Sequence, residues 1–239
     1  MKLAIPIVLL LLLLATDSAL SQETGVLDRK IDSDGHTYRY SVYVPSDYTG
    51  EQPWPLLVDL HGNGAQGDDG IRQTARLLAH EIRMNRKRFP LLVLFPQAAR
   101  GTGISGWNPE VVMAQIDRTI REFRVNSGRI YLSGFSMGGG GVYDTAARWP
   151  ERFAAAIAIA GPVPRDTSAL VKGLRGVPVR IVHGANDRQV PVEGSRRLVA
   201  ALKKAGAPVE YIEYPETGHD GEKAYADPEM IEWLLAHRR

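Results

Sequence analysis

The chain has 239 residues, which fits one large domain better than two small ones. Apolar residues make up 44% of the sequence and charged residues 23%, a balance typical of a globular protein and not of a disordered or fibrous one. The 29 Lys and Arg residues nearly match the 27 Asp and Glu residues, and the resulting net charge of +2 is too balanced to indicate nucleic acid or an anionic membrane as a partner.

The first predicted element is a leader that precedes the fold. Lys2 is followed by an almost unbroken apolar run over residues 3–15, and the small residues Ala19 and Ser21 stand at the two positions that a signal peptidase reads. We therefore expect a signal peptide over residues 1–21 and a secreted or periplasmic protein. The alternative is an uncleaved anchor, but the run is shorter than the roughly 20 residues that span a bilayer, so we expect no stable membrane anchor.

The sequence contains no cysteine. It therefore offers no disulfide, no thiol nucleophile and no site for a lipid anchor on cysteine. An exported protein of this kind depends on its hydrophobic core for stability. This fits a bacterial-type exported enzyme better than a small disulfide-rich extracellular domain.

Residues 22–239 alternate between predicted strands and helices. The first two strands, 26–31 and 38–44, alternate polar and apolar residues around a turn at 33–35, which predicts an antiparallel hairpin at a sheet edge. The next six strands are short apolar runs, typical of strands buried on both faces of a parallel sheet. They cover residues 56–60, 91–95, 129–132, 154–159, 179–182 and 209–212.

Amphipathic helices are predicted between these strands because apolar residues recur there at helical spacing. They cover residues 71–82, 111–123, 137–148, 193–204 and 229–237. This order predicts an α/β fold with a mostly parallel eight-stranded sheet flanked by helices. No repeat or dividing linker interrupts residues 22–239, so we expect a single domain. Only 17 residues, 161–177, separate the sixth and seventh strands, which leaves room for a minimal lid at most.

A glycine-rich turn between a strand and a helix carries the strongest chemical signal. The fifth strand runs directly into Gly134-Phe135-Ser136-Met137-Gly138, and a helix follows. In this context G-x-S-x-G forms a nucleophile elbow, which holds the serine in a strained conformation with its hydroxyl above the sheet. The alternative is a phosphate-binding turn, but the lysine or dinucleotide glycine pattern of such turns is missing. We therefore predict Ser136 as the nucleophile.

A serine hydroxyl needs a base to take its proton. In enzymes with such an elbow, an acid and then a histidine follow the serine in the chain. Three histidines follow Ser136: His183 ends a buried strand, His237 lies in the last predicted helix, and His219 lies in the loop between the last strand and the last helix. Because loops at the carboxyl ends of strands form such sites, we predict His219 as the base.

The acid is expected in the loop after the seventh strand, where Asp187 lies. The alternative is that Asp187 is a surface carboxylate paired with the arginine that follows it. Glu193 is the second candidate, but it opens the next predicted helix as a first-turn charge. Asp220 is adjacent to His219 in the chain, and this constrains it from presenting its carboxylate to the same ring.

Acyl transfer needs hydrogen-bond donors for the oxygen of the tetrahedral intermediate. One is expected to be the backbone N–H of Met137, the residue after the nucleophile, and the other to come from the loop after the third strand. That loop contains His61-Gly62-Asn63-Gly64, whose glycines suit a backbone that turns its amides inward. We favour the N–H of Asn63, with Gly62 as the alternative.

The same loop has a competing interpretation as a metal site. Its possible ligands are Asp59, His61, Asp68 and Asp69. No second histidine stands at ligand spacing and the loop lacks a calcium pattern, so we expect no metal and no other cofactor.

Two residues near the fourth strand are expected to bind substrate. Gln97 follows that strand, and Trp107 ends the glycine-rich stretch 101–107. An indole can stack on a sugar or an aromatic acyl group. The alternative is that Trp107 packs beneath the loop.

Four segments resemble the secreted-esterase branch of the α/β-hydrolases. They are residues 135–139, the Arg-Trp-Pro stretch 148–155, residues 178–190, and residues 214–235 with Gly-His-Asp. That branch includes predicted peptidases, phospholipase/carboxylesterase-type proteins, polyhydroxybutyrate depolymerases and feruloyl-esterase-like enzymes. The resemblance implies an α/β-hydrolase fold with Ser136, Asp187 and His219 as catalytic residues. One departure is the loop at 63–66, which reads Asn-Gly-Ala-Gln where the family often has more hydrophobic residues or a Glu-Arg pair.

These patterns predict a serine hydrolase that cleaves carboxylic esters through an acyl-enzyme on Ser136. Its expected partner is a small-molecule or polymer-linked ester, and nucleic acid is not expected. A serine peptidase of the prolyl-oligopeptidase-like type is the main alternative, and a non-catalytic binding protein of the same fold is another. The sequence indicates neither the acyl and alcohol groups nor the oligomeric state.

Overall fold

A computed structural model describes residues 23–101 and 106–239. The signal peptide predicted over residues 1–21 lies outside the described residues, as do positions 102–105 of the predicted glycine-rich stretch. Within the described ranges, none of the helices combines the length and the apolar character that a membrane span needs.

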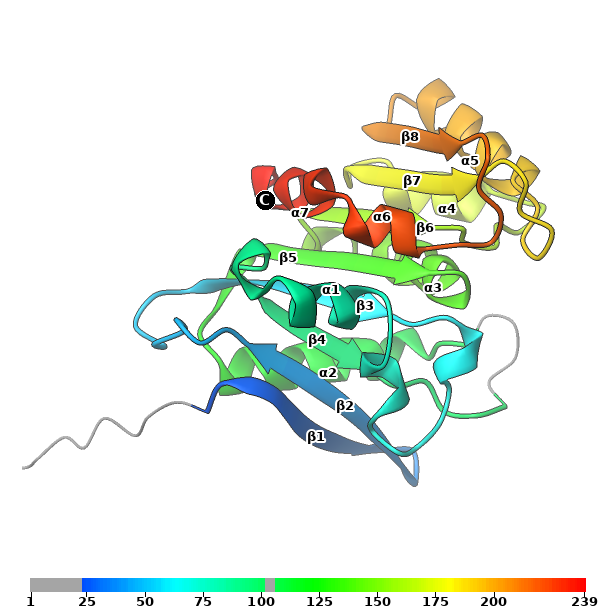
Figure 1. Ribbon diagram of the computed structural model, residues 1–239. Helices are drawn as coiled ribbons and strands as arrows, with labels where there is room; N and C mark the ends of the chain where they lie inside the picture. Colours follow the sequence, from blue (N-terminus) through cyan, green and yellow to red (C-terminus); the bar gives the residue numbers. More distant parts are fainter. Residues whose placement is uncertain (1–22, 102–105) are drawn as a thin grey trace, which may run out of the picture.

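An eight-stranded sheet forms the centre of the molecule (Figure 1), in the order β1-β2-β4-β3-β5-β6-β7-β8. The first two strands form the predicted antiparallel hairpin, β2 is also antiparallel to β4, and the remaining neighbours are parallel. The predicted mostly parallel α/β sheet is therefore confirmed. The strands are β1 (Gly25–Ser33), β2 (His36–Val44), β3 (Trp54–Leu60), β4 (Leu92–Pro96), β5 (Val125–Phe135), β6 (Ala155–Ile159), β7 (Val179–Gly184) and β8 (Val209–Tyr214).

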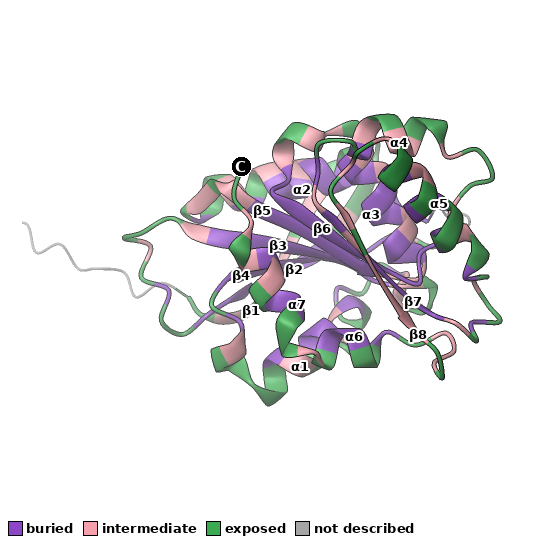
Figure 2. Cartoon of the chain, turned by 90° about the horizontal axis from the view of Figure 1, so that it is seen from above, coloured by how far each residue is buried: buried purple, intermediate pink, exposed green. Residues whose placement is uncertain are grey.

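Helices cover both faces of this sheet (Figure 2), and a separate hydrophobic core lies between the sheet and each helix layer. On one face α2, α3, α4 and α5 pack on the sheet, and on the other α1, α6 and α7 do so. A strand in the middle of the sheet is therefore buried on both sides, which explains its continuous apolar sequence. The helices are α1 (Leu78–Met84), α2 (Pro109–Glu122), α3 (Met137–Arg148), α4 (Ser168–Leu174), α5 (Glu193–Lys204), α6 (Glu222–Ala226) and α7 (Pro228–Ala236).

The helix predicted over residues 71–82 is wrong in its first half. The chain forms only a short 3-10 turn there, η2 (Arg72–Thr74), before α1 begins at Leu78. Leu77 has a φ of 52°, which is incompatible with a continuous right-handed helix. Ile71, which the pattern placed on the buried stripe, is 67% exposed.

Two further differences concern short or peripheral elements. The helices α4 and α6 were not predicted, because their seven and five residues are too few to show helical periodicity. The last strand, β8, is only partly buried, although its sequence predicted burial on both faces. It lies at the open edge of the sheet, where a second neighbour is missing.

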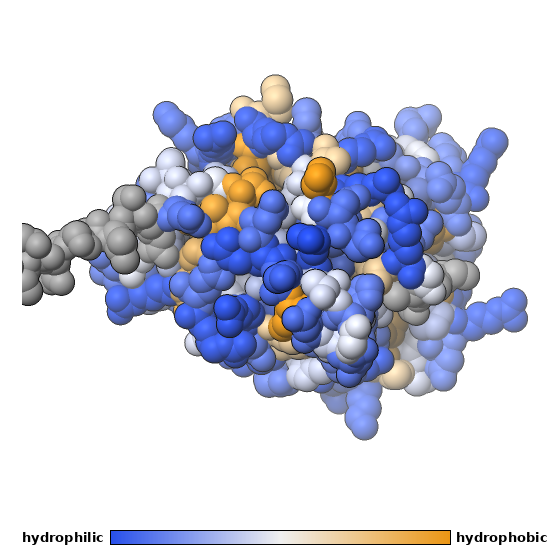
Figure 3. All heavy atoms as spheres, turned by 90° about the horizontal axis from the view of Figure 1, so that it is seen from below, coloured by the Kyte–Doolittle hydropathy of each residue, from blue (hydrophilic) through white to orange (hydrophobic). Residues whose placement is uncertain are grey.

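The opposite edge of the sheet is the hairpin strand β1. Its residues alternate between half-buried and exposed, and the exposed positions include Asp28, Lys30 and Asp32. The face seen in Figure 3 is largely hydrophilic, with hydrophobic residues confined to separate spots. Charged side chains on an edge strand oppose pairing with another chain.

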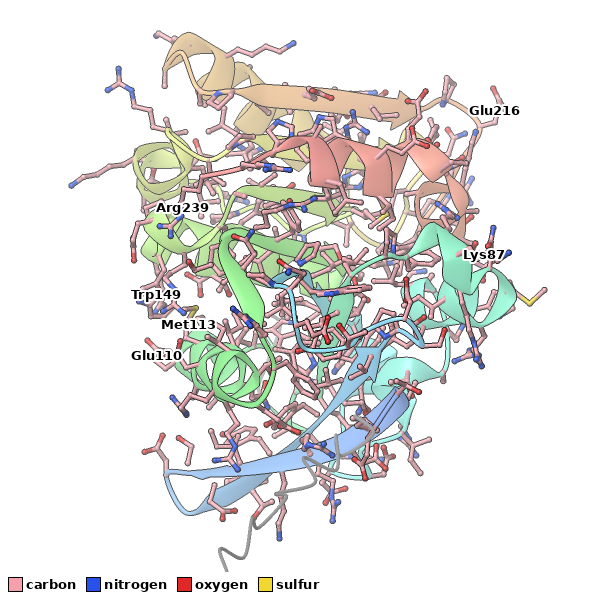
Figure 4. The ribbon with its side chains drawn as sticks, turned by 90° about the vertical axis from the view of Figure 1, so that its left-hand side faces the viewer. Lys87, Glu110, Met113, Trp149, Glu216 and Arg239 are labelled. Carbon is pink, nitrogen blue, oxygen red and sulfur yellow. The ribbon has the colours of Figure 1, made fainter. Side chains whose placement is uncertain are left out.

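The helix that follows the predicted elbow, α3, packs against α2. Figure 4 shows Glu110 and Met113 of α2 beside Trp149, the residue that follows α3. Glu110 also pairs with Arg148 at 2.8 Å. In the same figure, Glu216 marks the turn after β8, at the end toward which the parallel strands run. The loops after β3, β5, β7 and β8 meet at this end, which is where sites form in open α/β sheets.

Candidate active site

The turn between β5 and α3 holds Ser136 in the conformation that an elbow requires. Its φ and ψ are 57° and −119°, a region that non-glycine residues rarely occupy. The Ser136 amide donates a hydrogen bond of 2.8 Å to Ile159 O and so fastens the turn to β6. A Cβ atom on Gly138 would lie 1.7 Å from Leu60 O, so only glycine lets the elbow sit this close to β3.

Three predicted residues from three loops form one hydrogen-bonded chain. The Nε2 atom of His219 lies 2.8 Å from Ser136 Oγ, and its Nδ1 atom lies 2.6 Å from Asp187 Oδ2. An ionised carboxylate can only accept, so Nδ1 carries the ring proton and Nε2 accepts from the Ser136 hydroxyl. This is the arrangement that lets a histidine act as the base for a serine.

The surroundings of Asp187 keep it ionised. Burial raises the pKa of its carboxyl group, but hydrogen bonds from His219 and from the amides of Val190 and Gln189 outweigh burial and leave the pKa below its ordinary value. Both amides donate to Oδ1 at 2.8 Å, while Oδ2 faces His219. Asp187 is therefore a negative charge with a fixed orientation.

Three other candidates weighed from the sequence have different partners. Glu193 begins α5, and its carboxylate lies 3.6 Å from Arg196. Asp220 accepts a hydrogen bond from the Glu222 amide. His237 follows α7, where its Nδ1 atom contacts Trp233 O at 2.8 Å.

Two neighbours of the chain were not predicted from the sequence. The Phe135 ring lies 4.8 Å from the His219 ring, so it supports the imidazole from one side. His183 contacts the same carboxylate oxygen as His219, with its Nε2 atom 3.2 Å from Asp187 Oδ2. In the sequence, Phe135 occupies the variable position before the serine of the elbow. His183 stands at the end of the strand that leads to Asp187.

A cavity of about 740 Å³ opens beside the serine, and we call it the Ser136 cavity. Ser136, Met137 and Asn63 are among the residues that line it. The remaining wall combines apolar and polar side chains, most of them from the loops after β6 and β7 and from the start of α5. The apolar residues are Pro162, Val163, Val190 and Pro191, and the polar or charged residues are Gln66, Gln189, Glu193 and Arg197.

Two backbone amides in this cavity are suited to bind an oxyanion. Met137 is the first residue of α3, and Asn63 is the first residue of the 3-10 turn η1 (Asn63–Ala65). The amide of the first residue of a helix has no acceptor within that helix, and the helix N-terminus favours negative charge. Gly62, the alternative to Asn63, lines a different cavity.

Gln97 and Trp107 pack within the loops around the site. This differs from the prediction that they contact the substrate. The Gln97 side chain is 2% exposed, donates to Asp69 Oδ1 at 2.9 Å and accepts from the Gly70 amide at 2.7 Å. Trp107 is 8% exposed, and its ring lies 4.8 Å from the His61 ring. Neither is among the described residues that line the Ser136 cavity. The alternative placement of Trp107 beneath the loop matches this geometry.

Two of the possible metal ligands, Asp59 and His61, form hydrogen bonds with protein groups. Asp59 Oδ1 accepts hydrogen bonds from Ser133 Oγ and Tyr225 OH, both at 2.6 Å. His61 Nε2 accepts from the Ala98 amide at 3.0 Å. Burial raises the pKa of Asp59 to about 6 and lowers that of His61 to about 4. In the described part of the chain, no three His, Asp or Glu side chains are grouped to hold a metal ion.

A model of the dienelactone hydrolase family matches residues 106–229, more than half of the chain. The chain belongs to the dienelactone hydrolase family. The matched segment contains Ser136, Asp187 and His219. The resemblance to α/β-hydrolases is confirmed.

Two of the curated relatives are esterases by name. The chain is 33% identical over 153 residues to a bifunctional acetylxylan esterase/xylanase, XynS20E of Neocallimastix patriciarum, a match that covers 61% of this chain and 21% of that protein. It is 24% identical over 187 residues to a probable feruloyl esterase C of Aspergillus niger, covering 77% and 68%. The chain thus spans about a fifth of the first relative and two thirds of the second.

A solved structure of a thermostable esterase is similar to this member of the dienelactone hydrolase family. Its TM-score is 0.76 at 30% identity, and the match covers 90% of this chain and 63% of that one. The similarity extends over the sheet and both helix layers, because it includes nearly all of the described residues. The predicted resemblance to the esterase branch of the α/β-hydrolases is therefore confirmed.

Proposed function

We propose that the protein is a secreted serine hydrolase that cleaves carboxylic esters through an acyl-enzyme on Ser136. The observation that carries the proposal is the hydrogen-bonded chain from Ser136 through His219 to Asp187, with distances of 2.8 and 2.6 Å. It lies beside a cavity that Met137 and Asn63 also line. The leader predicted over residues 1–21 supports secretion.

In the first half of the reaction, His219 Nε2 takes the proton of Ser136 as Oγ attacks the ester carbonyl carbon. Asp187 stabilises the positive imidazole that results. The negative oxygen of the tetrahedral intermediate accepts hydrogen bonds from the amides of Met137 and Asn63. The bond to the alcohol oxygen then breaks, His219 returns the proton to that oxygen, and the acyl group remains on Ser136.

In the second half, a water molecule takes the place of the alcohol. His219 removes a proton from the water as the water attacks the acyl-enzyme, and the same amides bind the new oxyanion. The bond to Ser136 Oγ breaks, His219 returns its proton to the serine, and the carboxylic acid leaves. Both halves use one base, one nucleophile and one oxyanion site.

Hydrolysis of p-nitrophenyl acetate, p-nitrophenyl butyrate and methyl ferulate by residues 22–239 tests the proposal. The relatives' names favour acetyl and feruloyl esters. We expect Ser136→Ala to reduce ester hydrolysis by about 10³-fold or more. Ser168→Ala, at the start of α4, is a matched control on an exposed surface. Near-full activity of Ser136→Ala would reject the proposal.

Assays on the same protein also test the two alternatives predicted from the sequence, a serine peptidase and a non-catalytic binding protein. A serine peptidase would turn over peptide p-nitroanilides in preference to the esters. A non-catalytic protein would turn over neither and would not be labelled at Ser136 by a fluorophosphonate probe.

A further inference from the structure

Asp59 is a buried carboxylate that the acyl-transfer steps do not use. It lies near the end of β3, is 6% exposed, and its Oδ1 atom accepts hydrogen bonds from Ser133 Oγ and Tyr225 OH, both at 2.6 Å. Both partners are hydroxyl groups, so neither brings a positive charge to balance the carboxylate. Burial of a carboxylate among neutral partners is costly, and an apolar side chain would avoid this cost. The carboxylate therefore indicates a role other than stability.

The hydrogen bond from Ser133 links the strand of the nucleophile to the strand of the oxyanion loop. Asp59 and Ser133 are direct partners in the parallel register of β3 and β5, and Ser133 is fully buried. From Ser133 the chain continues to Ser136, and from Asp59 it continues to the loop that carries Asn63. This side-chain hydrogen bond therefore adds to the sheet hydrogen bonds that fix the two segments to each other.

The hydrogen bond from Tyr225 links the segment of the base to the same carboxylate. Tyr225 lies in α6, and its amide donates to Gly221 O at 3.1 Å, in the loop that carries His219. A Cβ atom on Gly221 would lie 2.8 Å from the Phe135 ring, and that ring lies 4.8 Å from the His219 ring. Because these groups are closely packed, a shift of α6 is passed on to the imidazole.

The helix α6 depends on such a link. It has only five residues, too few to be stable through its own hydrogen bonds. It lies with α1 and α7 on one face of the sheet (Figure 2), where the buried Tyr225 ring packs in the apolar core. Apolar contacts hold a helix against a sheet, but a hydrogen bond also fixes direction and distance. The bond from Tyr225 to Asp59 thus defines where α6 stands.

We propose that Asp59 and Tyr225 are positioning residues that hold His219 in line with Ser136; this inference rests on the proposed function. His219 Nε2 must stay within hydrogen-bond distance of Ser136 Oγ to take its proton, and it lies at 2.8 Å in the structure. Asp59 maintains this distance from below, through α6 and the loop before it. The substrate does not need to touch either positioning residue.

Tyr225→Phe tests the proposal because it removes only the hydroxyl group. Tyr131→Phe is the matched control, since Tyr131 is also fully buried on this face of the sheet and its hydroxyl donates to His237 O at 2.9 Å, after the end of α7. For p-nitrophenyl butyrate we expect kcat to fall about ten-fold in Tyr225→Phe, with a change in KM of less than about two-fold. We expect Tyr131→Phe to lower the Tm by a similar amount and to keep kcat. Equal kcat values for the two folded variants would overturn the proposal.

Two further variants separate hydrogen bonding from packing. Asp59→Asn keeps an oxygen that accepts from both hydroxyl groups, so we expect kcat to stay within about three-fold of the wild type. The triple variant Asp59→Leu/Ser133→Ala/Tyr225→Phe makes the cluster apolar. We expect its Tm at neutral pH to be equal or higher and its kcat still to be about ten-fold lower. Wild-type kcat in the folded triple variant, or an equal loss in Asp59→Asn, would contradict positioning by these hydrogen bonds.

The proton that His219 Nδ1 donates to Asp187 Oδ2 gives a readout that needs no substrate. In a bond of 2.6 Å such a proton resonates far downfield in proton NMR, and the resonance reports the alignment of the ring. We expect it to shift or broaden in Tyr225→Phe and to be unchanged in Tyr131→Phe. If the wild type hydrolyses no ester, the proposed function fails. If it does, and both kcat and the resonance are the same in the two variants, the failure belongs to the positioning role alone.

Discussion

His183 Nε2 lies 3.2 Å from Asp187 Oδ2, the same oxygen that accepts a hydrogen bond from His219. It also lies 2.9 Å from Val190 O, and a carbonyl can only accept, so Nε2 carries the ring proton. The other nitrogen, Nδ1, lies within hydrogen-bond distance of Ser195 Oγ, at 2.8 Å. The buried His183 therefore places a donor against the same carboxylate oxygen that His219 contacts, and it restricts the movement of Asp187.

The first prediction is that His183→Ala impairs catalysis without removing any group that touches the substrate. Loss of the ring frees Asp187 Oδ2 to move, and we expect kcat/KM for p-nitrophenyl butyrate to fall on the order of 10-fold to 100-fold. A carboxylate with one donor fewer stabilises a positive His219 more strongly, so the acid limb of the pH profile of kcat/KM moves to higher pH.

The control for this prediction is His183→Asn, whose amide can donate toward Val190 O and is expected to recover part of the activity. A purely structural role would lower the Tm of His183→Ala and leave the pH profile of the folded fraction unchanged. That outcome would contradict a positioning role.

The second prediction concerns the tautomer of His219. Asp187→Asn replaces an acceptor-only group with one that can donate, so the His219 Nδ1 atom is no longer required to carry the proton. We expect kcat to fall by about 10³-fold to 10⁴-fold with little change in the Tm. Glu216→Gln, in the exposed turn after β8, is the charge-matched control (Figure 4). Comparable activity of Asp187→Asn and Glu216→Gln would exclude Asp187 as the orienting acid.

The residues that sequence reasoning could find are those whose chemistry and chain order are fixed by one local pattern. Ser136 stands in a pentapeptide between a strand and a helix, and His219 and Asp187 follow it in loops after parallel strands. These loops converge because parallel strands end at one edge of the sheet. The order of elements alone therefore brings the three side chains near one another.

The residues that sequence reasoning could not place depend on contacts between distant segments. Gln97 is polar and follows β4, yet it is buried because the β3 loop folds over it and supplies its partners. The interaction of His183 with Asp187 depends on the turn after β7, which a strand-end histidine does not reveal. The same holds for the break at Leu77, where tertiary packing overrides helical periodicity.

The third prediction is that Asp59 makes the stability of the protein depend on pH. Its folded pKa is about 6 against an ordinary value of 3.8, because burial disfavours the charged form more than Ser133 and Tyr225 favour it. Between these values the folded state binds more protons than the unfolded state, so the free energy of unfolding falls as the pH rises from about 4 to about 6.

Asp59→Asn removes this dependence, and urea denaturation of both proteins from pH 4 to pH 7.5 measures it. Relative to the wild type, the variant should gain on the order of 3 kcal/mol across this range. His61 contributes to the pH dependence of the free energy of unfolding in both proteins, so its contribution cancels in the difference between them. A difference between the two proteins that does not change with pH would show that Asp59 does not titrate as described.

The fourth prediction concerns the close approach of the elbow to β3. In Gly138→Ala the added Cβ atom would overlap the Leu60 carbonyl, which is backbone and cannot turn away as a side chain would. We expect a loss of about 3 kcal/mol or more in the free energy of unfolding, together with lower esterase activity, because α3 and Ser136 must shift as one unit. Gly176→Ala is the control, since its Cβ would meet no heavy atom within 4 Å. Denaturant titration and p-nitrophenyl butyrate hydrolysis give the two readouts, and equal stability of the two variants would contradict the close packing of the elbow on β3.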